Sequence, residues 1–306
     1  MSFSWKGVFP AITTPFTPDD KLDFSLFEKN MSAQINAGID GVILGGTLGE
    51  SSVLTKEEKN ALVKFTLEKV AGRIPVALTI AEGATRDAIA EAGSAEKLGV
   101  QALMLLPPMR YKPDHRETVT FFNEVANSTS LPIMIYNNPV DYKTLVTLEM
   151  FDELQTCKNI TAVKESTRDV SNVTKMLNRF GERYQILCGV DTLALECLLM
   201  GAQGWVAGLV NAFPAETVAI YRYAKAGRIE DALKIHRWFL PLLELDLHPK
   251  LVQYIKLAAT KTGIGSEYVR APRLTLAGKE REEVLEIIEN GMKTQPDLGN
   301  YLSLNF

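Results

Sequence analysis

Short runs of apolar and β-branched residues recur along this chain, and an amphipathic segment follows each of them. The eight apolar runs lie at residues 7–13, 41–44, 76–80, 102–105, 133–136, 160–164, 185–187 and 204–206. Apolar residues spaced by three or four positions, as on one face of a helix, fill residues 25–37, 56–71, 85–98, 115–127, 147–153, 170–179 and 192–200. Strands that alternate with helices in this way predict a parallel sheet.

The number of strands favours a closed barrel over an open sheet. Eight strand–helix units in about 250 residues are typical of a (β/α)8 TIM barrel. A doubly wound open sheet would be favoured by a glycine-rich phosphate turn after the first strand, and the stretch Thr13-Thr14-Pro15-Phe16 is no such turn. We therefore predict an α/β fold in which residues 1–226 form the barrel.

The pattern becomes all-helical after the eighth strand. Helical periodicity continues at residues 215–226, 229–243, 250–262 and 280–290. The first of these is expected to be the eighth helix of the barrel, and residues 227–306 are expected to form a C-terminal helical extension. The tail, residues 294–306, has little periodicity and is predicted to be partly disordered.

Composition excludes several classes of protein. The chain has 306 residues, 46% of them hydrophobic and 23% charged, and its net charge of −4 offers no electrostatic basis for binding nucleic acid. The three cysteines have no paired spacing, which favours reduced thiols and a cytoplasmic protein, and the three histidines make no metal motif. Neither a signal peptide nor a membrane-spanning segment is expected.

Lys164 ends the sixth apolar run, in the stretch Asn159-Ile160-Thr161-Ala162-Val163-Lys164. A lysine at the tip of a buried strand is costly unless it is paired or its pKa falls. A lysine with a lowered pKa is a nucleophile that can form a Schiff base with a carbonyl carbon. The alternative is a lysine that only marks the end of the strand and reaches water.

The same rim of the predicted barrel gathers other polar groups, because reacting groups of such barrels lie at the carboxyl ends of the strands. Tyr136 ends the strand before that of Lys164 and could carry protons to and from a carbinolamine. The loop at residues 46–49 could offer backbone N–H groups and the Thr47 hydroxyl to a carboxylate. Together these groups predict an enzyme that holds a 2-oxo acid by its carboxylate and traps its carbonyl carbon as an imine.

Four motifs in this order resemble those of the N-acetylneuraminate lyase and dihydrodipicolinate synthase superfamily, whose members are Schiff-base barrel enzymes. The motifs are Gly-Thr-Leu-Gly-Glu-Ser at 46–51, Tyr-Asn-Asn-Pro at 136–139, Val-Lys-Glu at 163–165 and Gly-Trp-Val-Ala-Gly at 204–208. The resemblance implies that Lys164 forms the Schiff base and that Tyr136 transfers protons. It also implies a carboxylate site at Thr47 and the Leu48 backbone, a pocket lined by Gly189 and Val206, no cofactor and no metal, and a homotetramer.

Three positions depart from the synthase pattern. Leu48 stands where the synthases usually carry a second threonine, and Asp141 stands where they carry an arginine that holds the carboxylate of the second substrate. Arg110 occupies the place of a relay tyrosine that the synthases supply across a subunit interface, and Tyr111 could compensate for it one residue on. A carboxylate at position 141 would repel an anionic aldehyde.

The combination of Gly-Thr-Leu-Gly-Glu at 46–50, Tyr-Asn-Asn-Pro at 136–139 and the segment from His248 to Lys256 most resembles one branch of the superfamily. That branch is the 1-pyrroline-4-hydroxy-2-carboxylate deaminases of bacterial hydroxyproline breakdown, which are lyases or hydrolases. The alternatives are 4-hydroxy-tetrahydrodipicolinate synthase, an aldolase for 2-oxo-3-deoxy sugar acids, and a barrel that binds a ligand without catalysis. We also expect His248 in the substrate pocket, against the alternative of an exposed histidine at a helix start.

Overall fold

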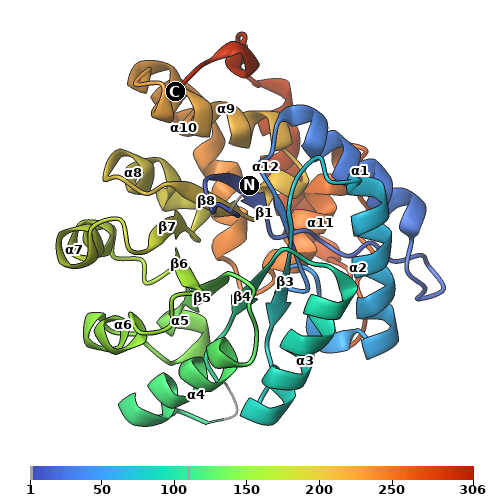
Figure 1. Ribbon diagram of the computed structural model, residues 1–306. Coiled ribbons are helices and arrows are strands. Elements are labelled where there is room, and N and C mark those ends of the chain that lie inside the picture. The colour runs from blue at the N-terminus through green and yellow to red at the C-terminus, as the bar shows by residue number, and fades with distance from the viewer. Residues whose placement is uncertain (1–2, 109–110) are drawn as a thin grey trace.

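The computed structural model describes residues 3–108 and 111–306, and its eight parallel strands form a nearly closed barrel (Figure 1). The strands are β1 (Gly7–Pro10), β2 (Val42–Leu44), β3 (Val76–Ile80), β4 (Ala102–Leu105), β5 (Ile133–Asn137), β6 (Ile160–Glu165), β7 (Gln185–Cys188) and β8 (Gly204–Ala207). Their order around the barrel is β1-β8-β7-β6-β5-β4-β3-β2, and a parallel bridge between Ala11 and Ile43 brings β1 to β2. The predicted (β/α)8 barrel is confirmed.

Helices cover the outside of the strands, as Figure 1 shows. They are α1 (Phe24–Ala37), α2 (Lys56–Val70), α3 (Thr85–Leu98), α4 (His115–Asn127), α5 (Pro139–Tyr142), α6 (Leu148–Leu154), α7 (Ser171–Phe180), α8 (Ala194–Leu199) and α9 (Pro214–Lys225). Nearly every strand residue is buried, because the helices cover one face of the sheet and the barrel interior covers the other. This double burial explains why the strands are continuous apolar runs.

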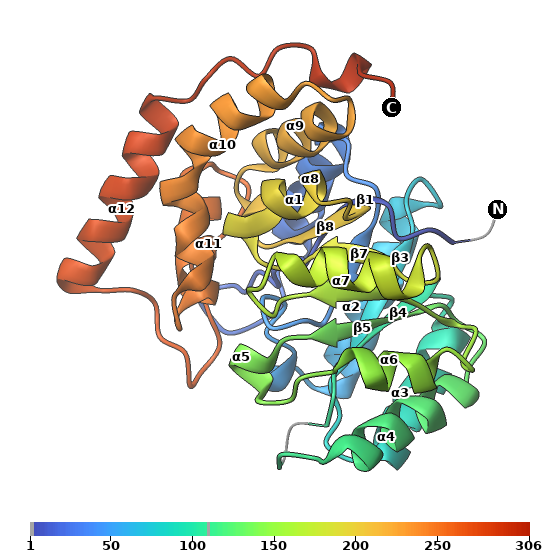
Figure 2. The same cartoon turned by 90° about the vertical axis from the view of Figure 1, so that its left-hand side faces the viewer.

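The C-terminal part adds a layer of helices on one side of the barrel. It consists of α10 (Ile229–Leu243), a 3-10 turn at Glu244–Leu247, α11 (Leu251–Lys261) and α12 (Gly278–Lys293), with α12 farthest from the strands (Figure 2). The tail is attached rather than loose, since the Tyr301 hydroxyl donates to the Ala37 carbonyl at 3.2 Å. In the described part of the chain, no helix is both long and apolar enough to cross a bilayer.

Two local features differ from the prediction. The first strand ends at Pro10 and not at Thr13, because the Thr13 N–H leaves the sheet and donates to the Asn211 side chain at 2.9 Å. The short helix α5 follows β5 directly, with Pro139 at its first position and Asn138 as its N-cap. This helix matters for the site because it returns Asp141 and Tyr142 to the rim of the barrel.

Candidate active site

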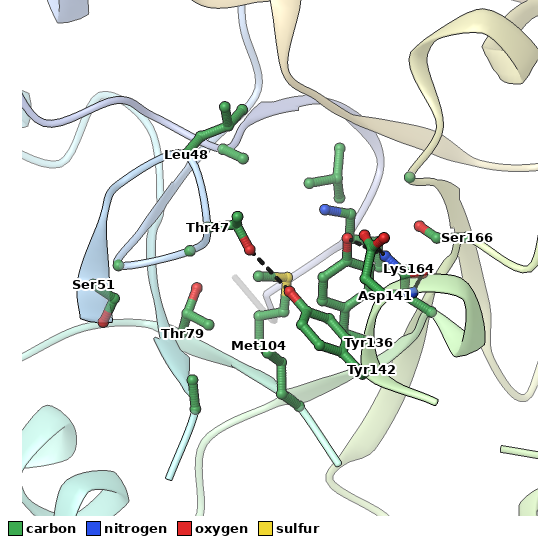
Figure 3. A pocket seen from close by; sticks show the side chains of 18 of the residues that line it. Thr47, Leu48, Ser51, Thr79, Met104, Tyr136, Asp141, Tyr142, Lys164 and Ser166 are labelled. Carbon is green, nitrogen blue, oxygen red and sulfur yellow. Dashed lines mark hydrogen bonds between the residues drawn. The ribbon is translucent and has the colours of Figure 1, made fainter. Parts of the chain in front are cut away.

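A cavity of about 600 Å³ opens at the carboxyl ends of the strands (Figure 3). It collects seven of the residues predicted for the site: Thr47, Leu48, Tyr136, Asp141, Lys164, Gly189 and Val206. These residues come from five different strand ends, and this assembly is the usual way in which a barrel builds a site. The cavity is large enough for a small organic acid.

Lys164 and Tyr136 face one another across neighbouring strands. The two residues are register partners on β6 and β5, and the Lys164 ammonium lies 4.0 Å from the centre of the Tyr136 ring. Burial is the main reason why the pKa of Lys164 falls below its usual value, although nearby acidic groups oppose the shift. A larger share of the Lys164 side chain is therefore uncharged, as a nucleophilic amine must be.

The Gly46–Gly49 loop brings Thr47 to the cavity, where its hydroxyl is 2.9 Å from the hydroxyl of Tyr142. Tyr142 also packs edge-on against Tyr136, with ring centres 5.3 Å apart. Figure 3 shows Thr47 and Tyr142 pointing toward each other beside Tyr136. Tyr142 was not predicted from the sequence, although its position three residues after the Tyr-Asn-Asn-Pro motif was a usable signal.

Asn138 joins Tyr136 to Asp141 and was also missed. Its amide nitrogen lies 3.0 Å from the Tyr136 hydroxyl and 2.7 Å from one Asp141 carboxylate oxygen. The Asn138 carbonyl oxygen accepts from the Asp141 backbone N–H at 3.2 Å, which is the cap of α5. A sequence pattern marks Asn138 only as a turn residue.

Two further carboxyl groups lie near Lys164. Asp191 accepts hydrogen bonds from the Trp205 indole at 2.8 Å and from the Leu209 backbone at 2.7 Å, so its position is fixed. Asp246 comes from the 3-10 turn after α10, and burial followed by the charge of Asp191 raises its pKa well above the usual range. The absence of a side chain at Gly208 leaves room for Asp246, since a Cβ there would lie 2.5 Å from a carboxylate oxygen.

Two buried hydroxyl groups of the cavity are available to a ligand. Within residues 3–108 and 111–306, neither the Thr79 hydroxyl nor the Ser166 hydroxyl has a hydrogen-bond partner. Both side chains line the cavity on opposite sides in Figure 3. A buried hydroxyl without a partner costs free energy, so these two groups indicate that the cavity receives a polar ligand.

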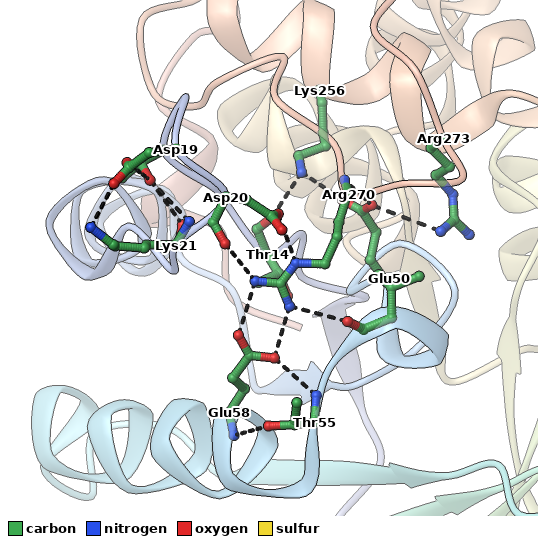
Figure 4. A network of polar contacts seen from close by, with 12 residues as sticks. Thr14, Asp19, Asp20, Lys21, Glu50, Thr55, Glu58, Lys256, Arg270 and Arg273 are labelled. Carbon is green, nitrogen blue, oxygen red and sulfur yellow. Dashed lines mark hydrogen bonds and ion pairs between the residues drawn. The ribbon is translucent and has the colours of Figure 1, made fainter.

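A buried ion pair lies next to the end of the Gly46–Gly49 loop (Figure 4). Glu50, which ends the loop, pairs with Lys256 of α11 at 2.6 Å, and Lys256 also donates to the Thr14 carbonyl at 2.8 Å. Burial lowers the pKa of Lys256 to about 8, and Glu50 opposes this shift. Arg270 extends the network to Glu58 at the start of α2. Glu50 therefore has a structural role.

Two of the predicted pocket residues that the structure describes do not line the cavity. His248 stacks on Tyr254, with ring centres 4.4 Å apart, and accepts from the Lys250 backbone, so Asp246 and Leu247 reach the cavity in its stead. Tyr111 is 56% exposed and lies outside the lining. Arg110 lies outside the described residues. Helix starts and loops are where a sequence pattern says least about the direction of a side chain.

The fold and the site define a class of protein: a lysine-dependent lyase built on a (β/α)8 barrel. Residues 4–291 match the Dihydrodipicolinate synthetase family, and the chain belongs to this family. It is 32% identical over 288 residues to the 4-hydroxy-tetrahydrodipicolinate synthase of Exiguobacterium sibiricum, which covers 93% of this chain and 96% of the relative. The synthase of Methanococcus maripaludis is also 32% identical, over 291 residues, covering 93% of this chain and 98% of the relative.

Solved structures agree with this assignment. The dihydrodipicolinate synthase of Aquifex aeolicus superimposes with a TM-score of 0.89 at 27% identity, covering 94% of this chain and 98% of that one. The 4-hydroxy-tetrahydrodipicolinate synthase of Methylacidiphilum fumariolicum gives a TM-score of 0.89 at 30% identity, with coverages of 95% and 96%. The names of these relatives support the alternative, a synthase. None of these names describes the deaminase that the sequence favoured.

Gly189→Ala tests the packing around Lys164. A Cβ at position 189 would lie 2.6 Å from Lys164 Cε and Cγ and 2.2 Å from the Ser166 hydroxyl, so the lysine must move. We expect the rate of borohydride trapping with pyruvate to fall about 10²-fold, the usual effect of a misplacement of about 1 Å. Gly93→Ala is the control, because a Cβ in that helix meets nothing within 4 Å. Trapping at the wild-type rate in both variants would contradict this reading of the site.

The pH dependence of trapping follows from the lowered pKa of Lys164. Imine formation needs the neutral amine, so the rate should rise with pH and level off below 10.5, the usual pKa of lysine. The charge of Asp246 raises the pKa of Lys164, and Asp246→Asn should therefore move the plateau to lower pH. Rapid-quench trapping at a series of pH values measures the plateau of the wild type and its shift in Asp246→Asn. N-acetyl-lysine amide serves as the reference amine. A plateau no lower than that of the reference would contradict the shift.

Proposed function

We propose that this enzyme deaminates 1-pyrroline-4-hydroxy-2-carboxylate to 2-oxoglutarate semialdehyde through an imine on Lys164. The observation that carries the proposal is the acidic surround of that lysine: Asp141 and Asp246 line the same cavity, and Asp191 lies close enough for its charge to act on Lys164. A second carboxylate close to Lys164 would meet repulsion there. A substrate with a single carboxylate and a basic ring nitrogen matches this charge.

The Gly46–Gly49 loop supports the position of the substrate carboxylate. Thr47 offers its hydroxyl, and the backbone of Leu48 offers an N–H group at a point where glycines let the ligand approach closely. Glu50 and Lys256 hold the end of this loop. With its carboxylate on the loop, the ring of the substrate extends toward Lys164 and Tyr136.

The chemistry balances with the groups present. The Lys164 amine adds to the C2 carbon of the cyclic imine, the ring C–N bond breaks with a proton delivered to the nitrogen, and the chain becomes an imine of Lys164. Loss of the proton at C3 and of the 4-hydroxyl as water leaves a C3=C4 double bond. Proton shifts from C5 and its nitrogen to C3 and C4 then convert the C5 amine into an imine. Hydrolysis of this imine and of the Lys164 imine takes up two waters and releases ammonia, 2-oxoglutarate semialdehyde and the free lysine. The unpaired hydroxyls of Thr79 and Ser166 are available to hold the substrate hydroxyl.

The second candidate is 4-hydroxy-tetrahydrodipicolinate synthase, which condenses pyruvate with aspartate semialdehyde. The names of the 32% identical relatives favour it. The same lysine and tyrosine serve both reactions, so the charge at position 141 is the main feature that separates them.

A direct comparison of substrates tests the proposal. The purified enzyme is given 1-pyrroline-4-hydroxy-2-carboxylate, and ammonia and semialdehyde are measured with a coupled dehydrogenase; in parallel it is given pyruvate with aspartate semialdehyde. We expect product only in the first assay, and none with Lys164→Met. Turnover in the second assay alone would replace the deaminase by the synthase, and cleavage of a 2-oxo-3-deoxy sugar acid alone would replace both.

We also propose that the enzyme is a cytoplasmic homotetramer, as the resemblance to its family implies. One solved structure of the family is described as a monomeric variant, so the assembly has to be measured on this chain. Light scattering coupled to gel filtration should give about four times the chain mass of 33.9 kDa. A mass of one chain would overturn the proposed assembly.

A further inference from the structure

Asn138 stands between the phenol of Tyr136 and the carboxylate of Asp141. Its side-chain nitrogen is 3.0 Å from the Tyr136 oxygen and 2.7 Å from an Asp141 oxygen, so both of its N–H bonds have acceptors. Its carbonyl oxygen accepts from the Asp141 backbone N–H at 3.2 Å. Tyr136 and Asn138 are buried, with Asn138 5% exposed, whereas Asp141 is exposed.

These partners decide which way the amide points. Turning the Asn138 amide by half a rotation would place its oxygen against the Asp141 carboxylate and its NH2 group against a backbone N–H. Both contacts would then be repulsive, and a buried polar group without a partner costs about 1–3 kcal/mol. The carboxylate of Asp141 thus holds the NH2 group of Asn138 toward Tyr136.

The direction of the bond to Tyr136 follows. The Asn138 N–H donates, so the Tyr136 oxygen accepts, and the proton of the Tyr136 hydroxyl is not used by Asn138. Tyr136 lines the cavity beside Lys164, whose nitrogen is 4.0 Å from the ring centre. The free O–H is therefore available to a molecule bound at Lys164.

We infer that Asn138 and Asp141 are positioning residues: Asp141 orients the Asn138 amide, and the Asn138 N–H makes Tyr136 a proton donor toward the cavity and then stabilises its phenolate. This inference rests on the imine chemistry proposed above. In the carbinolamine that pyruvate forms on Lys164, the C–O bond breaks as the C=N bond forms, and the Tyr136 proton leaves with the hydroxyl as water. The phenolate, held by the Asn138 N–H, then takes a proton from C3 to give the enamine.

This role changes the reading of Asp141. The sequence placed Asp141 among the residues that bind substrate, at a position where the synthases have an arginine. In the structure one of its oxygens is committed to Asn138, so Asp141 acts on Tyr136 through the amide. Asn138 and Asp141 are neighbours on one short turn, and both are needed for the arrangement.

Asn138→Asp tests the inference with almost no change of shape. A carboxylate at this position accepts the Tyr136 proton instead of donating to the oxygen, so the phenol is turned away from the cavity. Deuterium exchange at the methyl group of pyruvate, followed by NMR in D2O, reports the proton transfer, and the amount of imine trapped by borohydride at equilibrium reports pyruvate affinity. We expect N138D to lower the exchange rate about 10²-fold while the affinity changes less than about threefold.

Two more variants make the test specific. Asn138→Ala, which removes the donor without adding an acceptor, should lose less exchange than N138D. Lys143→Ala is the control, because this exposed lysine only donates to the Val140 carbonyl in the same turn, and it should exchange pyruvate like the wild type. A merely structural role of the turn would instead lower affinity and exchange together in all three variants.

The outcomes separate this inference from the proposed function. Equal exchange in N138D and the wild type, or a parallel loss of affinity and exchange, would overturn the role of Asn138. Wild-type exchange of pyruvate without deamination of 1-pyrroline-4-hydroxy-2-carboxylate would overturn the deaminase and leave the orientation of Tyr136 standing. A wild type that forms no trappable imine with either pyruvate or 1-pyrroline-4-hydroxy-2-carboxylate would overturn both.

Discussion

Lys164→Met should abolish imine formation and lower turnover on the order of 10⁴-fold or more, because it removes the proposed nucleophile and leaves only substrate binding. Methionine keeps the length of the side chain between β6 and Tyr136 but has no amine. The measurement is borohydride trapping with pyruvate followed by peptide mass spectrometry. The wild type should carry the added mass on the peptide with Lys164, and the variant should carry none.

Two other lysines with lowered pKa values, Lys225 and Lys256, serve as controls for this experiment. Lys225 is half-buried on α9, its pKa is also lowered by burial, and it does not line the cavity, so Lys225→Met should trap pyruvate normally. Lys256 has a pKa of about 8 but is held by Glu50. Added mass on Lys256 rather than Lys164 would overturn the assignment of the nucleophile. Circular dichroism of Lys164→Met should show a folded protein.

Lys256→Met should destabilise the protein by about 3–5 kcal/mol, the usual cost of leaving a buried charge without its partner. Glu50 is fully buried, and without Lys256 its remaining contacts are the Arg270 backbone N–H at 3.2 Å and Arg273 at 3.8 Å. Denaturant unfolding followed by circular dichroism measures the change. Because Glu50 ends the carboxylate-binding loop, we also expect a higher KM in this variant.

The control for this prediction lies on the same helix. Lys261 pairs with Glu289 at 2.7 Å, but both side chains are exposed by more than a third, and Lys261→Met should cost less than about 1 kcal/mol. The double variant Glu50→Gln with Lys256→Met removes both charges and should recover much of the lost stability. Equal losses for Lys256→Met and Lys261→Met would show that the buried pair contributes no more than a surface pair.

The parts of the fold that sequence predicted are those that depend on neighbours along the chain. Alternation of apolar runs with helical periodicity located all eight strands and the helix at 56–71, which is α2 in the structure. Lys164 and Tyr136 could be placed at one rim because parallel strands of a barrel direct their carboxyl ends to the same side. Their contact across β5 and β6 then required only the strand order.

The site residues that were not predicted from the sequence reach the cavity only because the chain folds back toward it. Asn138 and Tyr142 reach the cavity because α5 turns directly after β5, and Asp246 reaches it from a helical turn more than eighty residues after Lys164. His248, which the sequence placed in the pocket, stacks on Tyr254 instead. None of these directions follows from local periodicity.

By itself, the sequence determined the barrel, its family and the lysine–tyrosine pair, since these rest on strand order and on residue types at strand ends. Only the tertiary structure decided which charged groups surround Lys164 and which N–H group donates a hydrogen bond to the Tyr136 oxygen. The physical reason is that the pKa of a buried group and the direction of a hydrogen bond depend on atoms brought together from distant parts of the chain.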